Sequence, residues 1–236
     1  MNKILLGILL PLIGTSLGSC LVFFIKNNIN SKIEKIIIGF SIGIMLASSI
    51  FSLLMPSIEL SGKYKVLYPS IGLFAGFVFL YIVNKISNNS DMLTFSVTIH
   101  NIPEGAAVGV CLAGVIAKTI GIESALLLSL AIALQNIPEG SIISIPCRIK
   151  GCSKIKSFMY GFLSGVVEPI CSLITLLLLN IVVPILPILL SFASGCMIYV
   201  IFDDLICEIH KDNKPFLGLL GIFMGFIVMM ILDISF

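Results

Sequence analysis

Apolar residues fill long, uninterrupted runs along the chain, and short polar segments separate them. Each run holds about 20 residues or more, enough for a helix to cross a hydrocarbon core of ~30 Å at about 1.5 Å per residue. Only helices and closed barrels can span a bilayer, and continuous apolar runs of this length predict helices. The eight runs lie at residues 4–25, 36–55, 67–86, 92–117, 124–146, 157–183, 186–207 and 215–235.

The composition agrees with a membrane protein. Of the 236 residues, 58% are hydrophobic and 11% are charged, and the mean hydropathy is +1.16. A soluble domain of this size could not bury so much apolar surface, and large exposed apolar patches would cause aggregation. In a lipid bilayer the apolar surface faces an apolar solvent instead. We therefore expect an all-α, polytopic protein of the inner (plasma) membrane, folded as a single transmembrane domain over residues 1–236.

Lysine and arginine are distributed unevenly between the two sides of such a protein. Eight transmembrane spans place both termini on the same side of the membrane. With the termini outside, the inner segments hold ten Lys and Arg residues and the outer side holds four. Because cytoplasmic loops carry an excess of these residues, we expect both termini to lie outside.

Glycines recur at four-residue spacing in several of the runs. Small residues at this spacing let two helix backbones approach closely. We expect these glycines to pack helices within one bundle, with a homodimer interface as the alternative. The pairs are Gly14/Gly18, Gly39/Gly43, Gly72/Gly76, Gly105/Gly109, Gly161/Gly165 and Gly221/Gly225.

Most of the twelve acidic residues lie at helix ends or in loops, and three fall well within the predicted spans: Glu104, Glu139 and Glu168. No lysine or arginine lies at a comparable depth along the chain. A charged side chain at the bilayer centre costs about 2.5–3.5 kcal/mol on insertion scales. The three carboxylates therefore need another source of positive charge, which a bound cation or protons would supply.

Two of these glutamates lie in matching motifs. Five of six positions agree between HNIPEG at residues 100–105 and QNIPEG at residues 135–140. Residues i and i+4 share one helix face, and the prolines should kink both helices and expose backbone carbonyls. We expect one polar cavity to hold the polar side chains of both motifs, which are His100, Asn101, Glu104, Gln135, Asn136 and Glu139.

The side chains of this set are common metal ligands. One imidazole with carboxylates and amide oxygens suits zinc, iron, manganese or cobalt, whereas calcium and magnesium sites are normally all oxygen. Carboxylates can bridge, so Glu104 and Glu139 could hold two ions side by side. We expect the ion to be a transported substrate, with no cofactor and no nucleic-acid partner.

Both motifs resemble those of the ZIP family of metal-ion transporters, in particular its bacterial branch related to the GufA group. The family pattern is HNxPEG in the fourth helix and a second polar-x-x-x-Glu motif in the fifth. Further similar stretches run from Met45 to Pro56 and from Ser164 to Pro169. The resemblance implies an eight-helix ZIP-like bundle, a binuclear site halfway across the membrane and zinc import, with iron, manganese, cobalt and cadmium as further candidate cargo.

The resemblance also implies how the site residues divide. The first metal position would be formed by His100, Glu104, Gln135 and Glu139. The second would share the two glutamates as bridges and add Asn101, Asn136 and Glu168. Many relatives carry His and Asp where this chain has Gln135 and Asn136, and this neutral pair should weaken or retune the second position.

A further polar group lies at the inner end of the seventh run. An exit site for the metal could be formed there by Asp203, Asp204, Glu208 and His210. A solvated helix end accounts for these residues equally well.

Two other functions remain open. An intramembrane metal-dependent hydrolase needs an open metal position and a general base; Glu104 could be the base, but the sequence has no HExxH motif. A proton-coupled carrier of an organic compound could use the carboxylates as relays, but it leaves the His, Asn and Gln residues unexplained. We therefore expect a transporter rather than an enzyme.

The charge distribution leads to a topology prediction. Alkaline phosphatase fused to the C-terminus is expected to be active, because this enzyme folds only outside the cytoplasm. A fluorescent protein that matures only in the cytoplasm, fused at the same point, should stay dark. The opposite pair of results would contradict the orientation with both termini outside.

Overall fold

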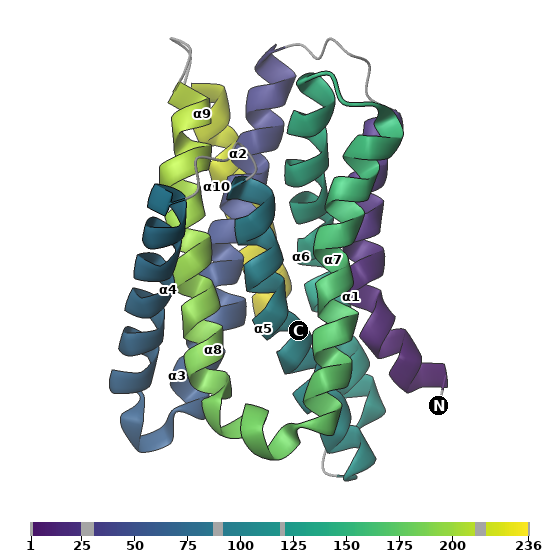
Figure 1. Ribbon diagram of the computed structural model, residues 1–236, viewed down its shortest axis with the longest axis vertical. Coiled ribbons are helices and arrows are strands. Elements are labelled where there is room, and N and C mark those ends of the chain that lie inside the picture. Colours follow the sequence, from purple (N-terminus) through teal and green to yellow (C-terminus); the bar gives the residue numbers. More distant parts are fainter. Residues whose placement is uncertain (1, 25–30, 87–91, 119–120, 211–215, 236) are drawn as a thin grey trace.

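The computed structural model describes residues 2–24, 31–86, 92–118, 121–210 and 216–235, and within these ranges it is a helical bundle without strands (Figure 1). The first half of the chain forms α1 (Asn2–Cys20), the 3-10 turn η1 (Leu21–Phe23), α2 (Ser31–Ser48), the π-helical η2 (Ser49–Leu54), α3 (Met55–Leu60), the 3-10 turn η3 (Gly62–Tyr64), α4 (Leu67–Ile86) and α5 (Met92–Ile116). The second half forms α6 (Ile122–Ile149), α7 (Lys154–Leu177), α8 (Leu179–Val200), the π-helical η4 (Ile201–Leu205), α9 (Ile206–His210) and α10 (Phe216–Ser235).

The predicted spans correspond to helices. Seven helical segments in the described part of the chain are long and apolar enough to cross a membrane. The eighth, α5, has 25 residues, and the part of it whose side chains are described includes the apolar stretch Asn101–Ile116. The helix α1 starts at the lower end of the bundle in Figure 1, and α10 starts at the upper end and runs downward. The expected all-α polytopic fold is therefore confirmed.

One predicted boundary is wrong. The sixth run was expected to end at residue 183, but α7 ends at Leu177 and α8 already begins at Leu179. The turn lies in a stretch of leucines, so hydropathy carried no signal for it. Pro184, which falls between the two predicted runs, lies inside α8, as does Pro187. Pro184 is the sixth residue of this helix, beyond its first turn, so its ring removes one intrahelical hydrogen bond.

The helices associate in two groups around α5. On one side α1 packs against α6 and α7, and on the other α2 packs against α10 and α4 against α8. The helix α5 contacts both α7 and α8, and it stands between these two groups in Figure 1. Its central place explains why a polar motif on α5 can meet side chains from both halves of the bundle.

The glycines pack helices within this chain, as expected. A Cβ atom added at Gly18 would collide with the backbone carbonyl of Ile137, and one at Gly140 would collide with the carbonyl of Thr15. Such close approach of backbones is the usual role of small residues in membrane helices. The contact fixes α1 directly against the half of α6 that carries the QNIPEG motif.

The close contact between α1 and α6 leads to a stability prediction. Gly140→Ala should lower the melting temperature in detergent by about 5 °C, because overpacking costs about 1–3 kcal/mol and 1 kcal/mol shifts a chain of this size by about 2–4 °C. The control is Gly121→Ala, at a residue with φ −71° and ψ 144° and no atom near its added Cβ. Equal melting temperatures for the two variants would contradict the packing argument.

Candidate metal site

The structure brings most of the predicted site residues into one buried polar centre. Their exposed fractions are 1% or less for Asn101, Glu104, Gln135, Asn136, Glu139 and Glu168. His100 lies on α5, but its side chain is outside the described residues. The buried side chains come from α5, α6 and α7, and each motif has its proline inside its helix at Pro103 or Pro138.

The first group of polar contacts surrounds Glu104. The Gln135 Nε2 atom donates a hydrogen bond of 2.6 Å to Glu104 Oε1. On its other side, Gln135 Oε1 lies 3.0 Å from Ser48 Oγ and 3.1 Å from Ser52 Oγ. Ser52 Oγ is also 2.6 Å from Asp233 Oδ1 on α10. Polar contacts therefore link Glu104, through Gln135 and Ser52, to the last helix of the bundle.

A π-helical turn supplies part of this group. Ser48 ends α2, and Ser52 lies within η2, which is wound more widely than an α-helix. Single π turns inside α-helices occur frequently at functional sites. Here both hydroxyls reach the same amide of Gln135 on α6.

The second group of polar contacts surrounds Glu168. Asn136 Nδ2 donates a hydrogen bond of 2.8 Å to Glu168 Oε2, and Thr15 Oγ1 donates one of 3.3 Å to Glu168 Oε1. Nearby, Asn101 Nδ2 donates to the backbone carbonyl of Ser164 at 3.1 Å. Glu104 and Glu168 thus accept hydrogen bonds from separate sets of partners.

Glu139 belongs to both groups electrostatically. It is fully buried, and its charge interacts with those of Glu104 and Glu168. Like charges that share a buried site repel one another, so the group of three carboxylates favours a cation among them.

Several buried oxygens in this centre accept no hydrogen bond from the described residues. They are Glu104 Oε2, Asn101 Oδ1 and Asn136 Oδ1. An unsatisfied buried acceptor costs about 1–3 kcal/mol, and more when it is charged. A bound cation or an ordered water would supply the missing partner. Carboxylate and amide oxygens can bind a cation or accept a hydrogen bond from water.

A cavity leads from Glu104 toward Asp233. It has a volume of about 320 Å³, and its lining includes Ser52, Glu104, Gln135 and Asp233. The unpartnered oxygens Glu104 Oε2 and Asp233 Oδ2 belong to residues of this lining. The cavity gives the polar centre space for water or a small cation.

Sequence reasoning missed Asp233, Thr15, Ser48 and Ser52 as neighbours of the site. Asp233 lies inside the last apolar run, but so near its end that it resembles the acids at the other helix ends. Its apolar neighbours Leu232 and Ile234 are the one sequence feature that could have indicated a buried acid. Thr15 had no such feature, because Ser and Thr are common in membrane helices and their role depends on which helix lies opposite. Ser48 and Ser52 lie within the stretch from Met45 to Pro56 that resembles the ZIP family, but that resemblance gave them no role.

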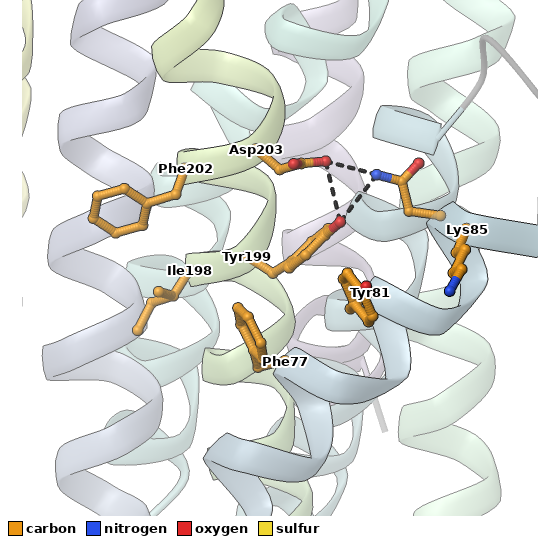
Figure 2. Close-up of a pocket in the computed structure, with 8 residues that line it drawn as sticks. Phe77, Tyr81, Lys85, Ile198, Tyr199, Phe202 and Asp203 are labelled. Atoms are coloured by element: carbon orange, nitrogen blue, oxygen red, sulfur yellow. Dashed lines mark hydrogen bonds between the residues drawn. The ribbon is translucent and has the colours of Figure 1, made fainter.

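Of the residues proposed as an exit site, the structure describes the side chain of Asp203. Asp203, in η4, accepts hydrogen bonds on its Oδ2 atom from Asn84 Nδ2 at 2.6 Å and from Tyr199 Oη at 3.1 Å, as Figure 2 shows. This group lines a cavity of about 570 Å³ between α4 and α8. The side chains of Asp204, Glu208 and His210 fall outside the described residues. Asp203 thus faces α4 and lies apart from the carboxylates of α5, α6 and α7.

Within the described side chains, no three of the residue types His, Cys, Asp and Glu form a compact metal-binding group. The centre instead combines carboxylates with amides and hydroxyls. The fold and this centre together define a polytopic membrane protein with a buried, carboxylate-rich polar site.

Comparison with known proteins identifies the family. The family model described as ZIP Zinc transporter matches residues 86–233. The zinc transporter ZupT of Clostridium perfringens is 31% identical over 97% of this chain and 95% of its own length. The zinc transporter GufA of Myxococcus xanthus is 29% identical over 95% of this chain and 96% of its own. The chain belongs to the ZIP family.

Animal relatives match a shorter part of the chain. The zinc transporter ZIP11 of Xenopus tropicalis is 47% identical over 61% of this chain, and the human ZIP11 is 45% identical over the same share. The matched region spans 43% and 42% of these two proteins. This chain therefore corresponds to less than half the length of its animal relatives.

The contact between Asn136 and Glu168 leads to a prediction. Asn136→Asp removes the N–H donor at 2.8 Å and places a second carboxylate beside Glu168. Without metal, the melting temperature in detergent should fall by about 3–6 °C, the effect of roughly 1–2 kcal/mol. Added Cd²⁺ or Zn²⁺ should recover this loss, because a divalent cation neutralises the new pair.

The matched control is Asn180→Asp, which adds the same charge at an exposed residue near the start of α8. It should change neither the melting temperature nor its response to metal. A metal response in Asn136→Asp that equals the response of the unaltered protein would count against an ion beside Glu168.

Proposed function

We propose that this protein imports a divalent transition-metal ion across the inner membrane through the polar centre on α5, α6 and α7. Zinc is the leading candidate for this ion. The observation that carries the proposal is the burial of Glu104, Glu139 and Glu168, each exposed by 1% or less, beside the buried amides of Gln135 and Asn136. Burying three ionisable carboxylates in a membrane protein is costly unless a cation occupies the site for part of the cycle. The relatives ZIP11, GufA and ZupT are named zinc transporters, which supports the choice of cargo.

The site would hold two ions that share Glu104 and Glu139. The first ion would also bind His100 and Gln135, and the second would also bind Asn101, Asn136 and Glu168. Support comes from the two separate groups of hydrogen bonds, one around Glu104 and one around Glu168, with Glu139 coupled to both. Neutral Asn136 makes the second position the weaker one, because it contributes an amide oxygen and no charge.

The mixed donor set also bears on selectivity. Carboxylates, amides and an imidazole suit zinc, iron, manganese, cobalt and cadmium, which a site of this kind separates by size and geometry. Cysteine thiols are absent from both motifs, which makes the site a poor one for Cu⁺. The protein acts as a transporter in this proposal, and the ion is cargo that must also be able to leave.

Loss of a bridging glutamate tests the transport site. Glu104→Ala or Glu139→Ala should reduce uptake of radioactive zinc into proteoliposomes at least a hundredfold, because each removes a ligand of both ions. Glu168→Ala should cause a smaller loss, since it contributes to one position. The surface variant Glu123→Ala, in the first turn of α6, is the control and should keep normal uptake.

Each variant must be reconstituted at the same protein level, so that lost uptake reflects the site and not expression. Near-normal uptake by Glu104→Ala would eliminate the shared site. Equal losses in Glu104→Ala and Glu168→Ala would eliminate the bridging role and leave a single ion position.

A further inference from the structure

The amide of Gln135 points its nitrogen, and not its oxygen, at the carboxylate of Glu104. Nε2 lies 2.6 Å from Glu104 Oε1, and Oε1 of the amide lies between the hydroxyls of Ser48 and Ser52 at 3.0 and 3.1 Å. Only the oxygen of an amide can bind a metal ion, since its nitrogen is a donor without a free lone pair. In this arrangement the potential ligand atom faces away from Glu104.

This orientation follows from the partners of the amide. Amide nitrogen and oxygen are assigned from the hydrogen-bond network. A carboxylate only accepts hydrogen bonds, so the opposite orientation would place two acceptor oxygens 2.6 Å apart. With an empty site and an ionised Glu104, the nitrogen therefore faces the carboxylate.

A cation beside Glu104 reverses this preference. The positive N–H end of the amide would then face the ion at close range, whereas the oxygen would be attracted to it and could bind it. A turn of about 180° about the last side-chain bond exchanges the two atoms, and this terminal torsion is a broad one with two nearly equivalent settings. The same side chain can thus serve an empty and a filled site.

The serines allow both orientations because a hydroxyl can donate or accept a hydrogen bond. Ser48 is fully buried and makes no other hydrogen bond among the described residues. It can donate to the amide oxygen when the site is empty and accept from the amide nitrogen when the site is filled. Ser52 has one proton and two acceptors within reach, of which Asp233 is the nearer at 2.6 Å.

We propose that the Gln135 side chain inverts when the ion arrives, and that Ser48 is the positioning residue which satisfies the amide in both states. The inference rests on the proposed transport site and adds a two-state ligand to it. In the empty state Gln135 supplies the hydrogen bond that stabilises Glu104, and in the filled state it supplies an oxygen ligand. The amide therefore stabilises the Glu104 carboxylate when the site is empty and binds the ion when the site is filled.

Gln135 can be observed directly because it is the only glutamine in the chain. Protein grown with glutamine labelled with ¹³C at Cδ and ¹⁵N at Nε2 gives one side-chain signal, and ¹¹³Cd²⁺ serves as the probe ion. Solid-state NMR should then find the cadmium closer to ¹³Cδ than to ¹⁵Nε2. On cadmium binding the amide proton signals should also lose the downfield shift that a short bond to a carboxylate produces.

Substitution of Ser48 gives an independent measurement. Without this hydroxyl the inverted amide keeps a buried N–H without a partner, which proteins tolerate less well than a carbonyl that lacks one of two partners. Ser48→Ala should therefore weaken cadmium affinity about fivefold to tenfold, and Ser48→Thr should restore it. In a Gln135→Ala background, Ser48→Ala should change the affinity less than twofold, because the two residues act through one contact.

The control is Ser49→Ala, at an equally buried neighbour whose hydroxyl bonds to the carbonyl of Leu46 in its own helix. It should bind cadmium normally. If the protein binds cadmium with ¹⁵Nε2 as the nearer atom, or if Ser48→Ala has the same effect with and without Gln135, the inversion is wrong while the transport site stands. If the unaltered protein binds no cadmium and transports none, the proposed function itself fails.

Discussion

The constraint on which this structure depends is the burial of three carboxylates among membrane helices. Glu104, Glu139 and Glu168 lie where an uncompensated charge is expensive. The hydrogen bonds to Glu104 and Glu168 come from amides and hydroxyls, which are weaker partners than an ammonium or guanidinium group. Partial compensation leaves the site attractive to a cation and still lets the cation leave, a balance that a tightly paired carboxylate could not provide.

The packing of the helices follows from the need to deliver those donors. Glycines let α1 press its backbone against α6, and this contact brings Thr15 within 3.3 Å of Glu168. On the opposite side of the centre, the wide turn of η2 holds Ser52 between Gln135 and Asp233. Close helix packing and a local irregularity thus serve the same purpose. Each places a short polar side chain beside a carboxylate that has no lysine or arginine beside it among the described contacts.

Much of the site could be predicted because its signal is local. The motifs at residues 100–105 and 135–140 agree at five of six positions, and helical periodicity places the polar side chains of each motif near one face of its helix. The contact between Gln135 and Glu104 agrees with that expectation. Asp233 was not predicted, because its distance along the chain from both motifs gives no hint that α10 returns to the cavity they line.

The sequence by itself determined that the chain crosses a membrane as helices, since the length and polarity of each run fix where backbone groups can be buried. It also determined which residues could bind a metal, because ligand chemistry belongs to the side chain. Only the tertiary structure decided the donors around each carboxylate, the turn at Leu178 and the direction in which the Gln135 amide points. These depend on atoms from different helices meeting within about 3 Å, a distance that is set by packing and not by the order of residues in any one span.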